Sequence, residues 1–399
     1  MNIEWVKISD VLFFQEGPGV RNTQYTEKGV KLLNVANLVD GKVDLSTSDR
    51  YISEEEAYGK YKHFLCDTGD FIVASSGIKV EYIDKKMGFI NESMLPLCMN
   101  TSTIRFKVLD NKKLNIRYFM YYLKSHHFKD QLAIHITGSA QLNYGPSHLK
   151  KMTMPLIDLV KQNEIIEKLD KLQSIITHRQ KQLEKLDEFI KARFVEMFGD
   201  PVENPLHWDT MPLESACCSI VDCPHSTPSY TFEDTGYMCI RTSIVKKNSI
   251  LWDNIEYIPK DEYEQRIKRR KPRKGDIIYT REGAILGIAA IIDRDCNVAL
   301  GQRSMLLSPD TEICLPEFIS NAMNFDSFFN RVTEGVSGSA SPHINVADIR
   351  AFNIMMPPLT LQQQFATFIK QTDKSKVAVQ KELDKTKMLF DSLMQEYFG

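Results

Sequence analysis

The fold is decided by residues 156–199, which read LIDLVKQNEIIEKLDKLQSIITHRQKQLEKLDEFIKARFVEMFG. Apolar side chains recur there at intervals of three, four or seven residues, at Ile165, Leu169, Leu172, Ile176, Leu183, Leu186, Ile190 and Met197. Five heptads of this kind predict one long helix with a single apolar stripe. We expect Asp158 to cap its start and Gly199, followed by Asp200 and Pro201, to end it.

A second stretch, 358–399, repeats this register 200 residues further on. Gln162 recurs as Gln362, and the same offset joins Gln180, Lys181, Leu183, Lys185, Glu196, Phe198 and Gly199 to identical residues. Its stripe is formed by Phe365, Ile369, Val379, Leu383, Phe390, Leu393 and Tyr397, and is interrupted by Thr372, Lys376 and Thr386. Thr360 and Gln363 have the spacing of a capping box at its start. This second seam is therefore predicted to be weaker than the first.

Helices of about 40 residues would each be roughly 60 Å long and must bury their stripes. We predict that they pair with each other as an antiparallel coiled coil, with the globular parts at opposite ends. The alternative is that each helix packs only on its own globular domain. An internal duplication favours pairing, because two similar halves can imitate a homodimer.

The remaining segments are predicted to form two domains that mix helices and strands. Short strand-like runs begin after Gly69-Asp70 and Gly275-Asp276, which correspond at an offset of 206. Helical patterns cover 116–128 and 316–332. We therefore predict an α+β protein with a pseudo-two-fold internal repeat. Its parts are a first variable domain (1–155), a central helical spacer (156–199), a second variable domain (200–357) and a C-terminal helical spacer (358–399).

Composition excludes several classes of protein. A chain of 399 residues with 43% hydrophobic residues is long enough for two or three domains. It contains no run of eighteen apolar residues and no signal-peptide pattern, so we expect a cytoplasmic protein without membrane contact. Phosphate-binding, dinucleotide-binding, methylation and nuclease motifs are all missing from the sequence. We therefore expect no catalysis by this chain and no cofactor.

The eight cysteines show no disulfide spacing and are interpreted as reduced thiols. Four potential zinc ligands fall within nine residues, at Cys217, Cys218, Cys223 and His225. A structural zinc site normally uses two separated pairs, and adjacent cysteines rarely both bind one ion. Buried thiols are the preferred interpretation, and no metal is predicted.

Positive charge is concentrated in one run although the net charge is only −2. Residues 266–274 contain seven basic residues and no acid, with Arg269, Arg270 and Lys271 at the centre. This run indicates phosphate binding, and the competing interpretation is a solvated charged face. It leads into the strand and turn that carry Arg281, with Arg303 further along. The corresponding turn in the first half contains Ser75, Ser76 and Lys79.

Two further pairs of segments are candidates for contact with DNA. Small and polar residues precede each long helix, with Ser139, Gln141 and Asn143 in the first half and Ser339 and His343 in the second. Gln and Asn offer the donor and acceptor pair that suits adenine, although an ordinary Gly/Ser connection fits the composition equally well. Turn-rich segments near the start of each domain add Arg21 and Asn22 in the first half and His225 in the second.

Taken together, these features resemble the DNA specificity subunit of type I restriction-modification systems. The resemblance rests on the tandem plan, on GPGVRNTQY at 17–25, on LLNVAN at 32–37 and on DCPHSTP at 222–228. It covers essentially the whole chain. One departure from the family pattern is the polar interruption of the second helix.

The resemblance implies a division of labour between this chain and its partners. Each variable domain would be a target-recognition domain that reads one half of a split, asymmetric site in double-stranded DNA, and the helices would set the distance between halves. Two DNA adenine methyltransferase subunits would dock on the helices and flip their target adenines, and restriction/translocase subunits would join them. The rival interpretations are a coiled-coil scaffold that binds only proteins and the recognition fragment of a methyltransferase-nuclease.

Overall fold

A four-stranded antiparallel sheet occurs twice in the chain, once in each half. The computed structural model describes residues 3–135, 143–334 and 342–399. The chain divides into unit 1, Met1–His178 with Glu382–Gly399, and unit 2, Arg179–Lys381. Each unit therefore contains one globular part and a portion of both long helices.

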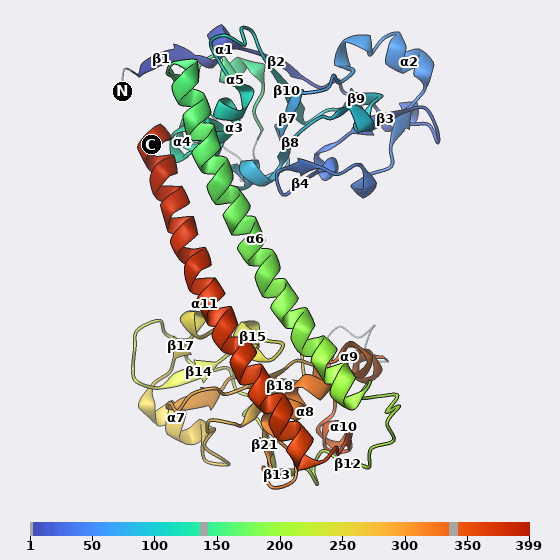
Figure 1. Cartoon of the computed structure of the whole chain (residues 1–399), viewed down its shortest axis with the longest axis vertical. Coiled ribbons are helices and arrows are strands. Elements are labelled where there is room, and N and C mark those ends of the chain that lie inside the picture. Colours follow the sequence, from blue (N-terminus) through green and yellow to red (C-terminus); the bar gives the residue numbers. More distant parts are fainter. Residues whose placement is uncertain (1–2, 136–142, 335–341) are drawn as a thin grey trace. The chain divides into compact units, whose positions relative to one another are not determined.

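Unit 1 contains its four-stranded sheet in the order β2-β10-β7-β8, and these strands lie side by side in Figure 1. A three-stranded sheet, β6-β3-β9, and the pairs β1-β11 and β4-β5 complete its strands. The bounds are β1 Glu4–Lys7, β2 Leu12–Glu16, β3 Val30–Leu33, β4 Leu38–Val39, β5 Lys42–Val43, β6 Tyr51–Ile52, β7 Phe71–Ala74, β8 Met87–Phe89, β9 Leu97–Met99, β10 Thr103–Val108 and β11 Thr153–Leu156. The helices of this globular part are α1 Ile8–Val11, α2 Glu54–Tyr58, α3 Ile116–Lys124, α4 His126–His135 and α5 Pro146–Leu149.

Unit 2 repeats this plan. Its four-stranded sheet has the order β13-β21-β18-β19, beside the three-stranded sheet β17-β14-β20 and the pairs β12-β22 and β15-β16. The bounds are β12 Thr210–Pro212, β13 Cys217–Asp222, β14 Met238–Ile240, β15 Val245–Lys246, β16 Ser249–Ile250, β17 Glu256–Tyr257, β18 Ile277–Thr280, β19 Ala289–Ile291, β20 Val298–Leu300, β21 Ser304–Pro309 and β22 Asn353–Met355. The helices are α7 Lys260–Arg266, α8 Pro316–Met323, α9 Asp326–Thr333 and α10 Val346–Arg350.

The two long helices are α6, Leu159–Phe198, and α11, Leu359–Phe398, each of 40 residues. In unit 1 the first turns of α6, including Leu169, share a core with Phe398 at the end of α11. In unit 2 the end of α6, including Phe198, shares a core with Phe365 near the start of α11. Opposite ends therefore meet in each unit, and the helices run antiparallel as the repeat predicts.

Each long helix also packs on a globular part. In unit 1 the end of α11 lies beside α3 and α4 (Figure 1), where the Phe398 ring is 5.1 Å from the Tyr118 ring. In unit 2 the Phe198 ring is 4.9 Å from the Phe318 ring of α8. Pairing between the helices and packing on the domains, stated as alternatives in the sequence analysis, therefore both occur.

Capping of the helices agrees with the sequence at two points and differs at one. Asp158 Oδ1 accepts the backbone N–H of Lys161 at 3.0 Å, so Asp158 caps α6. Gly199 ends α6 with φ +79°, a left-handed conformation that glycine adopts without strain. The capping box at Thr360 was wrong, because α11 already begins at Leu359 and Pro358 accepts the N–H of Gln362.

The prediction of one continuous helix at 116–128 and another at 316–332 was wrong in one respect. Each is broken into two helices, α3 and α4 in unit 1 and α8 and α9 in unit 2. Ser125 has extended backbone at the first break, and its hydroxyl accepts the N–H of Phe128 at 3.2 Å. A serine that caps the next helix interrupts a helical pattern that apolar periodicity alone would continue.

Two of the three polar residues that interrupt the second seam, Thr372 and Lys376, lie in unit 2 and are accommodated there. Thr372 is buried and its hydroxyl donates to the backbone oxygen of Phe368 at 3.0 Å. Lys376 extends to α6, where its Nζ lies 2.5 Å from Asp187 Oδ1. A lysine at a seam position is thus matched by an acid on the facing helix.

Candidate nucleic-acid interface

The ends of three adjacent strands lie side by side at one end of each four-stranded sheet. In unit 1, β10 is antiparallel to both of its neighbours, so Ile104 pairs with Glu16 and Thr103 pairs with Ala74. In unit 2, Met305 pairs with Asp222, and Ser304 pairs with Thr280. The loops that follow β2 and β7 and the turn that precedes β10 are therefore neighbours, as are the corresponding segments of unit 2, although they are far apart in the sequence.

The turn after the inner strand meets the segment before the long helix in both units. In unit 1, Ser76 forms a β-bridge with Asn143, and Tyr144 N–H donates to Ser75 O at 2.9 Å. In unit 2, Glu282 forms the equivalent bridge with His343. Two candidate segments that the sequence analysis treated separately thus form one surface in each half.

The turn before β10 or β21 belongs to the same surface. Ser102 and Arg303 occupy equivalent places, with φ of +66° and +69°. Left-handed backbone is uncommon for residues other than glycine, and such strain is often found at functional sites. Ser76 Oγ donates to Ser102 Oγ at 2.6 Å, whereas the exposed Arg303 side chain lies beside Gly283.

The loop at 222–228 in unit 2 is held by three polar side chains. Arg281 donates to both carboxylate oxygens of Asp222, at 2.9 and 3.2 Å. Arg266 donates to Ser226 O at 2.8 Å, and Gln302 Nε2 donates to His225 O at 2.5 Å. The exposed imidazole of His225 lies 3.1 Å from Asp222.

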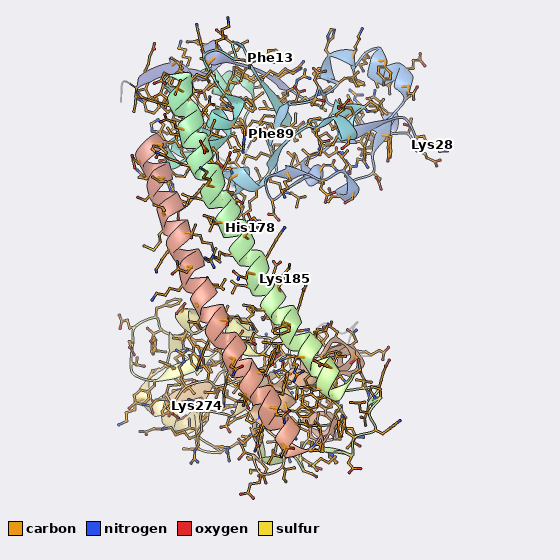
Figure 2. The ribbon with its side chains drawn as sticks, in the orientation of Figure 1. Phe13, Lys28, Phe89, His178, Lys185 and Lys274 are labelled. Carbon is orange, nitrogen blue, oxygen red and sulfur yellow. The ribbon has the colours of Figure 1, made fainter. Side chains whose placement is uncertain are left out.

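The basic run packs beside this loop, and its members differ in exposure. Arg266 is buried and holds the loop, and Arg270 lies 3.6 Å from Asp276 with its side chain 31% exposed. Arg269 and Lys271 are exposed, the former 3.3 Å from Asp222 O and the latter 3.2 Å from Asn297 Oδ1. Lys274, at the end of the run and labelled in Figure 2, is also exposed. The run therefore combines structural arginines with accessible cations.

The corresponding loop in unit 1 is organised by amide and phenol groups. Arg21 N–H donates to Gln24 Oε1 at 3.1 Å, while the side chains of Arg21 and Asn22 are exposed. Asn100 Nδ2 donates to Asn34 Oδ1 at 2.8 Å and lies 3.4 Å from the hydroxyl of Tyr25.

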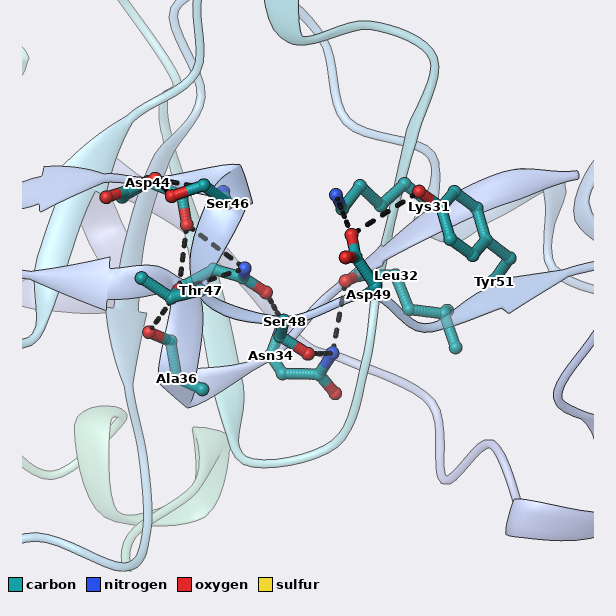
Figure 3. A network of polar contacts seen from close by, with 11 residues as sticks. Lys31, Leu32, Asn34, Ala36, Asp44, Ser46, Thr47, Ser48, Asp49 and Tyr51 are labelled. Carbon is teal, nitrogen blue, oxygen red and sulfur yellow. Dashed lines mark hydrogen bonds and ion pairs between the residues drawn. The ribbon is translucent and has the colours of Figure 1, made fainter. Parts of the chain in front are cut away.

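Asn34 connects this loop to the segment that ends at Tyr51. Its Nδ2 donates to Leu32 O at 3.1 Å and to Ser48 Oγ at 3.3 Å (Figure 3). The guanidinium of Arg50 lies 5.3 Å from the centre of the Tyr25 ring. Sequence reasoning missed Tyr25, Arg50 and Gln302, because only the register of the three-stranded sheets places them beside the candidate loops.

We call these groups of segments the first and second recognition surfaces. The first comprises residues 16–25, 75–79, 100–102 and 143–145, and the second comprises 222–228, 266–271, 281–283, 301–303 and 342–344. Lys79, Asn143 and His343 are exposed on them. Ser75 and Arg281 are buried, at 1% and 7% exposure, so their side chains support the turns from within. Ser139, Gln141 and Ser339 lie outside the described residues.

The cysteines near the second recognition surface are arranged as individual thiols. Cys217 is buried and the adjacent Cys218 is exposed, at a point where the pairing of β13 with β21 shifts in register. Cys223 Sγ accepts the N–H of Ser304 at 3.3 Å, and burial raises the pKa of that thiol. Within residues 3–135, 143–334 and 342–399, no cluster of three or more His, Cys, Asp or Glu is suited to a metal ion.

In the same ranges, no helix is long and apolar enough to cross a membrane.

The family described as type I restriction modification DNA specificity domain matches this chain twice, over residues 2–187 and 215–386. The EcoBI specificity subunit of Escherichia coli is 22% identical, covering 98% of this chain and 84% of that protein. The EcoKI specificity subunit of Escherichia coli K12 is 22% identical, covering 72% of this chain and 65% of that protein. The MjaVIII specificity subunit of Methanocaldococcus jannaschii is 25% identical, and the match spans 46% of this chain and 43% of that protein.

Two solved structures share the fold over nearly the whole chain. The type I restriction-modification S subunit from M. genitalium has a TM-score of 0.56 at 15% identity, covering 100% of this chain and 97% of that one. A chain from a study of complex assembly and conformational transition in the type I system has a TM-score of 0.54 at 16% identity. That match covers 99% of this chain and 97% of the other.

Proposed function

Because this chain belongs to the type I restriction-modification DNA specificity family, we propose that its two recognition surfaces read the two halves of a bipartite, asymmetric site in double-stranded DNA. The main support is that the same loops gather at the same sheet edge twice, with different side chains at matching places. A repeated framework positions two readers, and their differences give two different half-sites. Residues 1–155 and 200–357 would be the recognition domains, and 156–199 and 358–399 the spacers.

The exposed side chains divide into two kinds of DNA contact. Arg21 and Lys79 on the first surface, and Arg269 and Lys271 on the second, present cations suited to phosphates. Asn22 and Asn143 of the first half, and Arg303, His225 and His343 of the second, present hydrogen-bonding groups suited to base edges, and we place the half-buried Ser76 with them. We assign Arg270 a mixed role, since its ion pair with Asp276 also supports the fold.

The remaining work of the complex is assigned to partner subunits. We propose that two DNA adenine methyltransferase subunits dock on the paired helices and that restriction/translocase subunits join them, with this chain supplying recognition and no catalysis. We place this work in the cytoplasm, because its target would be chromosomal or invading DNA. Purified chain incubated with labelled S-adenosylmethionine and DNA should transfer no methyl group. Methyl transfer by the chain alone would support the methyltransferase-nuclease alternative.

The proposal is tested by selecting duplexes from a randomised DNA pool with the full-length chain. A split consensus with a fixed gap is expected, and its binding should weaken as salt rises. If neither the chain alone nor the chain with its methyltransferase enriches any sequence, the protein-binding scaffold is favoured.

Reversing charge at Arg269 and Lys271 sharpens this test, and Arg270 is left unchanged to keep its ion pair. The double variant R269E/K271E should weaken binding to all sequences and reduce the slope of log affinity against log salt by roughly 2. The matched control is K181E/K185E on α6, where both lysines are exposed and Lys185 is visible in Figure 2. Unchanged affinity of R269E/K271E at low salt would remove this run from the interface.

A further inference from the structure

An acidic residue ends the outer strand of the four-stranded sheet in both units. Glu16 is the last residue of β2, and Asp222 is the last residue of β13. Their cross-strand partners, Ile104 and Met305, are equivalent residues of β10 and β21. The two carboxylates therefore occupy the same place on the first and second recognition surfaces.

In unit 2 this carboxylate is neutralised from within. Arg281 is buried and donates to both oxygens of Asp222, and His225 lies 3.1 Å from one of them. Such a two-point arginine–carboxylate pair is strong and directional. Asp222 is thus committed to holding its own loop, and its side chain is only 18% exposed.

In unit 1 the same carboxylate lacks this internal cation. Ser75 stands where unit 2 has Arg281, since each directly follows the inner strand, β7 or β18. The Ser75 hydroxyl is buried and has no hydrogen-bond partner among the residues that the structure describes. Glu16 is exposed, and within the described part of the chain it forms no hydrogen bond or ion pair. The nearby Tyr144 hydroxyl is also buried and forms no hydrogen bond within the ranges 3–135, 143–334 and 342–399, and burial together with the Glu16 charge raises the pKa of Tyr144.

The local packing places Glu16 inside the first recognition surface. A Cβ added at Gly145 would lie 3.3 Å from Glu16 Oε2, so the carboxylate sits directly over that glycine. A Cβ at Gly17 would lie 2.0 Å from Asn100 O, which shows how closely this strand end approaches the 100–102 turn. The carboxylate therefore lies between two segments of the surface.

A carboxylate at this place repels phosphates and can only accept hydrogen bonds. On the edge of a base pair, the group that matches such an acceptor is an exocyclic amino group, and the pairing typical of Glu and Asp is with the N4 amino group of cytosine. We propose that Glu16 reads a cytosine in the half-site of the first recognition domain. The second domain lacks this contact because the carboxylate of Asp222 is already bound by Arg281. This inference rests on the proposed function.

The test compares wild-type chain with Glu16→Gln in selection from a randomised pool of duplex DNA. Wild type should enrich a half-site containing a C·G pair that the variant no longer requires, with a loss of preference of about 5- to 150-fold at that position. The matched control is Glu55→Gln, an exposed acid on α2. Arg303→Ala should instead alter the other half-site.

A second variant tests the cause of the difference between units. Ser75→Arg supplies the cation that unit 2 has, so it should weaken the cytosine preference while Glu16 remains in place. Circular dichroism melting curves verify that each variant is folded. If Ser75→Arg does not fold, the comparison of wild type with Glu16→Gln decides the outcome alone. The same consensus at every position for wild type and Glu16→Gln, or a change in the half-site that Arg303→Ala alters, would overturn the proposal. No enriched sequence with wild type would instead overturn the proposed function itself.

Discussion

The two joints between a globular part and the following long helix use the same positions in different ways. In unit 1, Gln162 Nε2 donates to Lys113 O and Ile157 O, both at 2.8 Å, and its Oε1 accepts Asn115 N–H at 2.9 Å. In unit 2, Gln362 donates to Pro357 O and accepts Leu315 N–H, both at 2.8 Å. Both glutamines are fully buried. The buried part of the joint is therefore repeated without change.

The exposed part of the joint is reversed in charge. Arg117 Nη2 lies 2.6 Å from Asp170 Oδ1 in unit 1, and the residues 200 further on are Glu317 and Lys370, whose charged atoms are 3.9 Å apart in unit 2. A buried amide must satisfy particular backbone groups, so few alternatives exist. An exposed ion pair requires only opposite charges, so either arrangement serves.

The aromatic cores of the joints should give the largest effects. Phe198→Ala and Phe398→Ala each remove a buried ring and should lower the free energy of unfolding of their unit by about 3–5 kcal/mol. Phe198 should cost more, because it contacts Phe194, Phe318 and Phe365, whereas Phe398 contacts Tyr118 and Tyr122. Urea denaturation followed by circular dichroism measures both. A loss below about 1 kcal/mol in either variant would show that the joint is not a core.

The repeated glutamines should give equal, intermediate effects. Gln162→Leu or Gln362→Leu leaves buried backbone groups without partners and should cost about 1–3 kcal/mol of unfolding free energy. Gln363→Leu, at the exposed neighbouring position, is the control and should be nearly neutral. Clearly unequal losses in the two glutamine variants would contradict the equivalence of the joints.

The reversed ion pairs should give smaller effects that can be rescued. Arg117→Glu places like charges together and should cost up to about 1 kcal/mol. Adding Asp170→Lys should restore much of this loss by copying unit 2, although the hydrogen bond from Tyr121 to Asp170 is then lost. A double-mutant cycle in urea measures the coupling, and its absence would show that the charges act independently.

The smallest effect on stability is expected from Asp373→Gln in α11, a change that copies Gln173, the residue at the equivalent position of α6. Desolvation raises the pKa of Asp373, with Lys376 opposing this shift and Asp187 adding to it. A raised pKa in the folded state means that relative stability is lost as pH rises through that pKa. Asp373→Gln removes this cost of burying a charge and should therefore stabilise unit 2 at neutral pH. The gain should be small, because the Asp373 side chain is still 55% exposed. Thermal melting at pH 3 and pH 7 measures this, and an equal gain at both values would contradict the cause.

Several features followed from local sequence patterns. The apolar spacing predicted α6 and α11 to within three residues at each end, because helix periodicity and the cap at Asp158 are short-range properties. The Gly-Asp repeats predicted the starts of β7 and β18. Gly69 and Gly275 adopt φ of +88° and +90°, and each following aspartate accepts a backbone N–H three residues before it.

The tertiary structure alone decided which candidate residues share a surface and which of them are accessible. Register between strands distant in sequence brought the 75–79, 100–102 and 143–145 segments together. Burial turned Arg281 into an internal partner of Asp222, while the equivalent Glu16 was left accessible. The sequence by itself determined that there are two similar halves and two long helices, since periodicity and repetition are properties of residue order. Only long-range pairing and packing could decide what each half exposes, because burial depends on neighbours that residue order does not name.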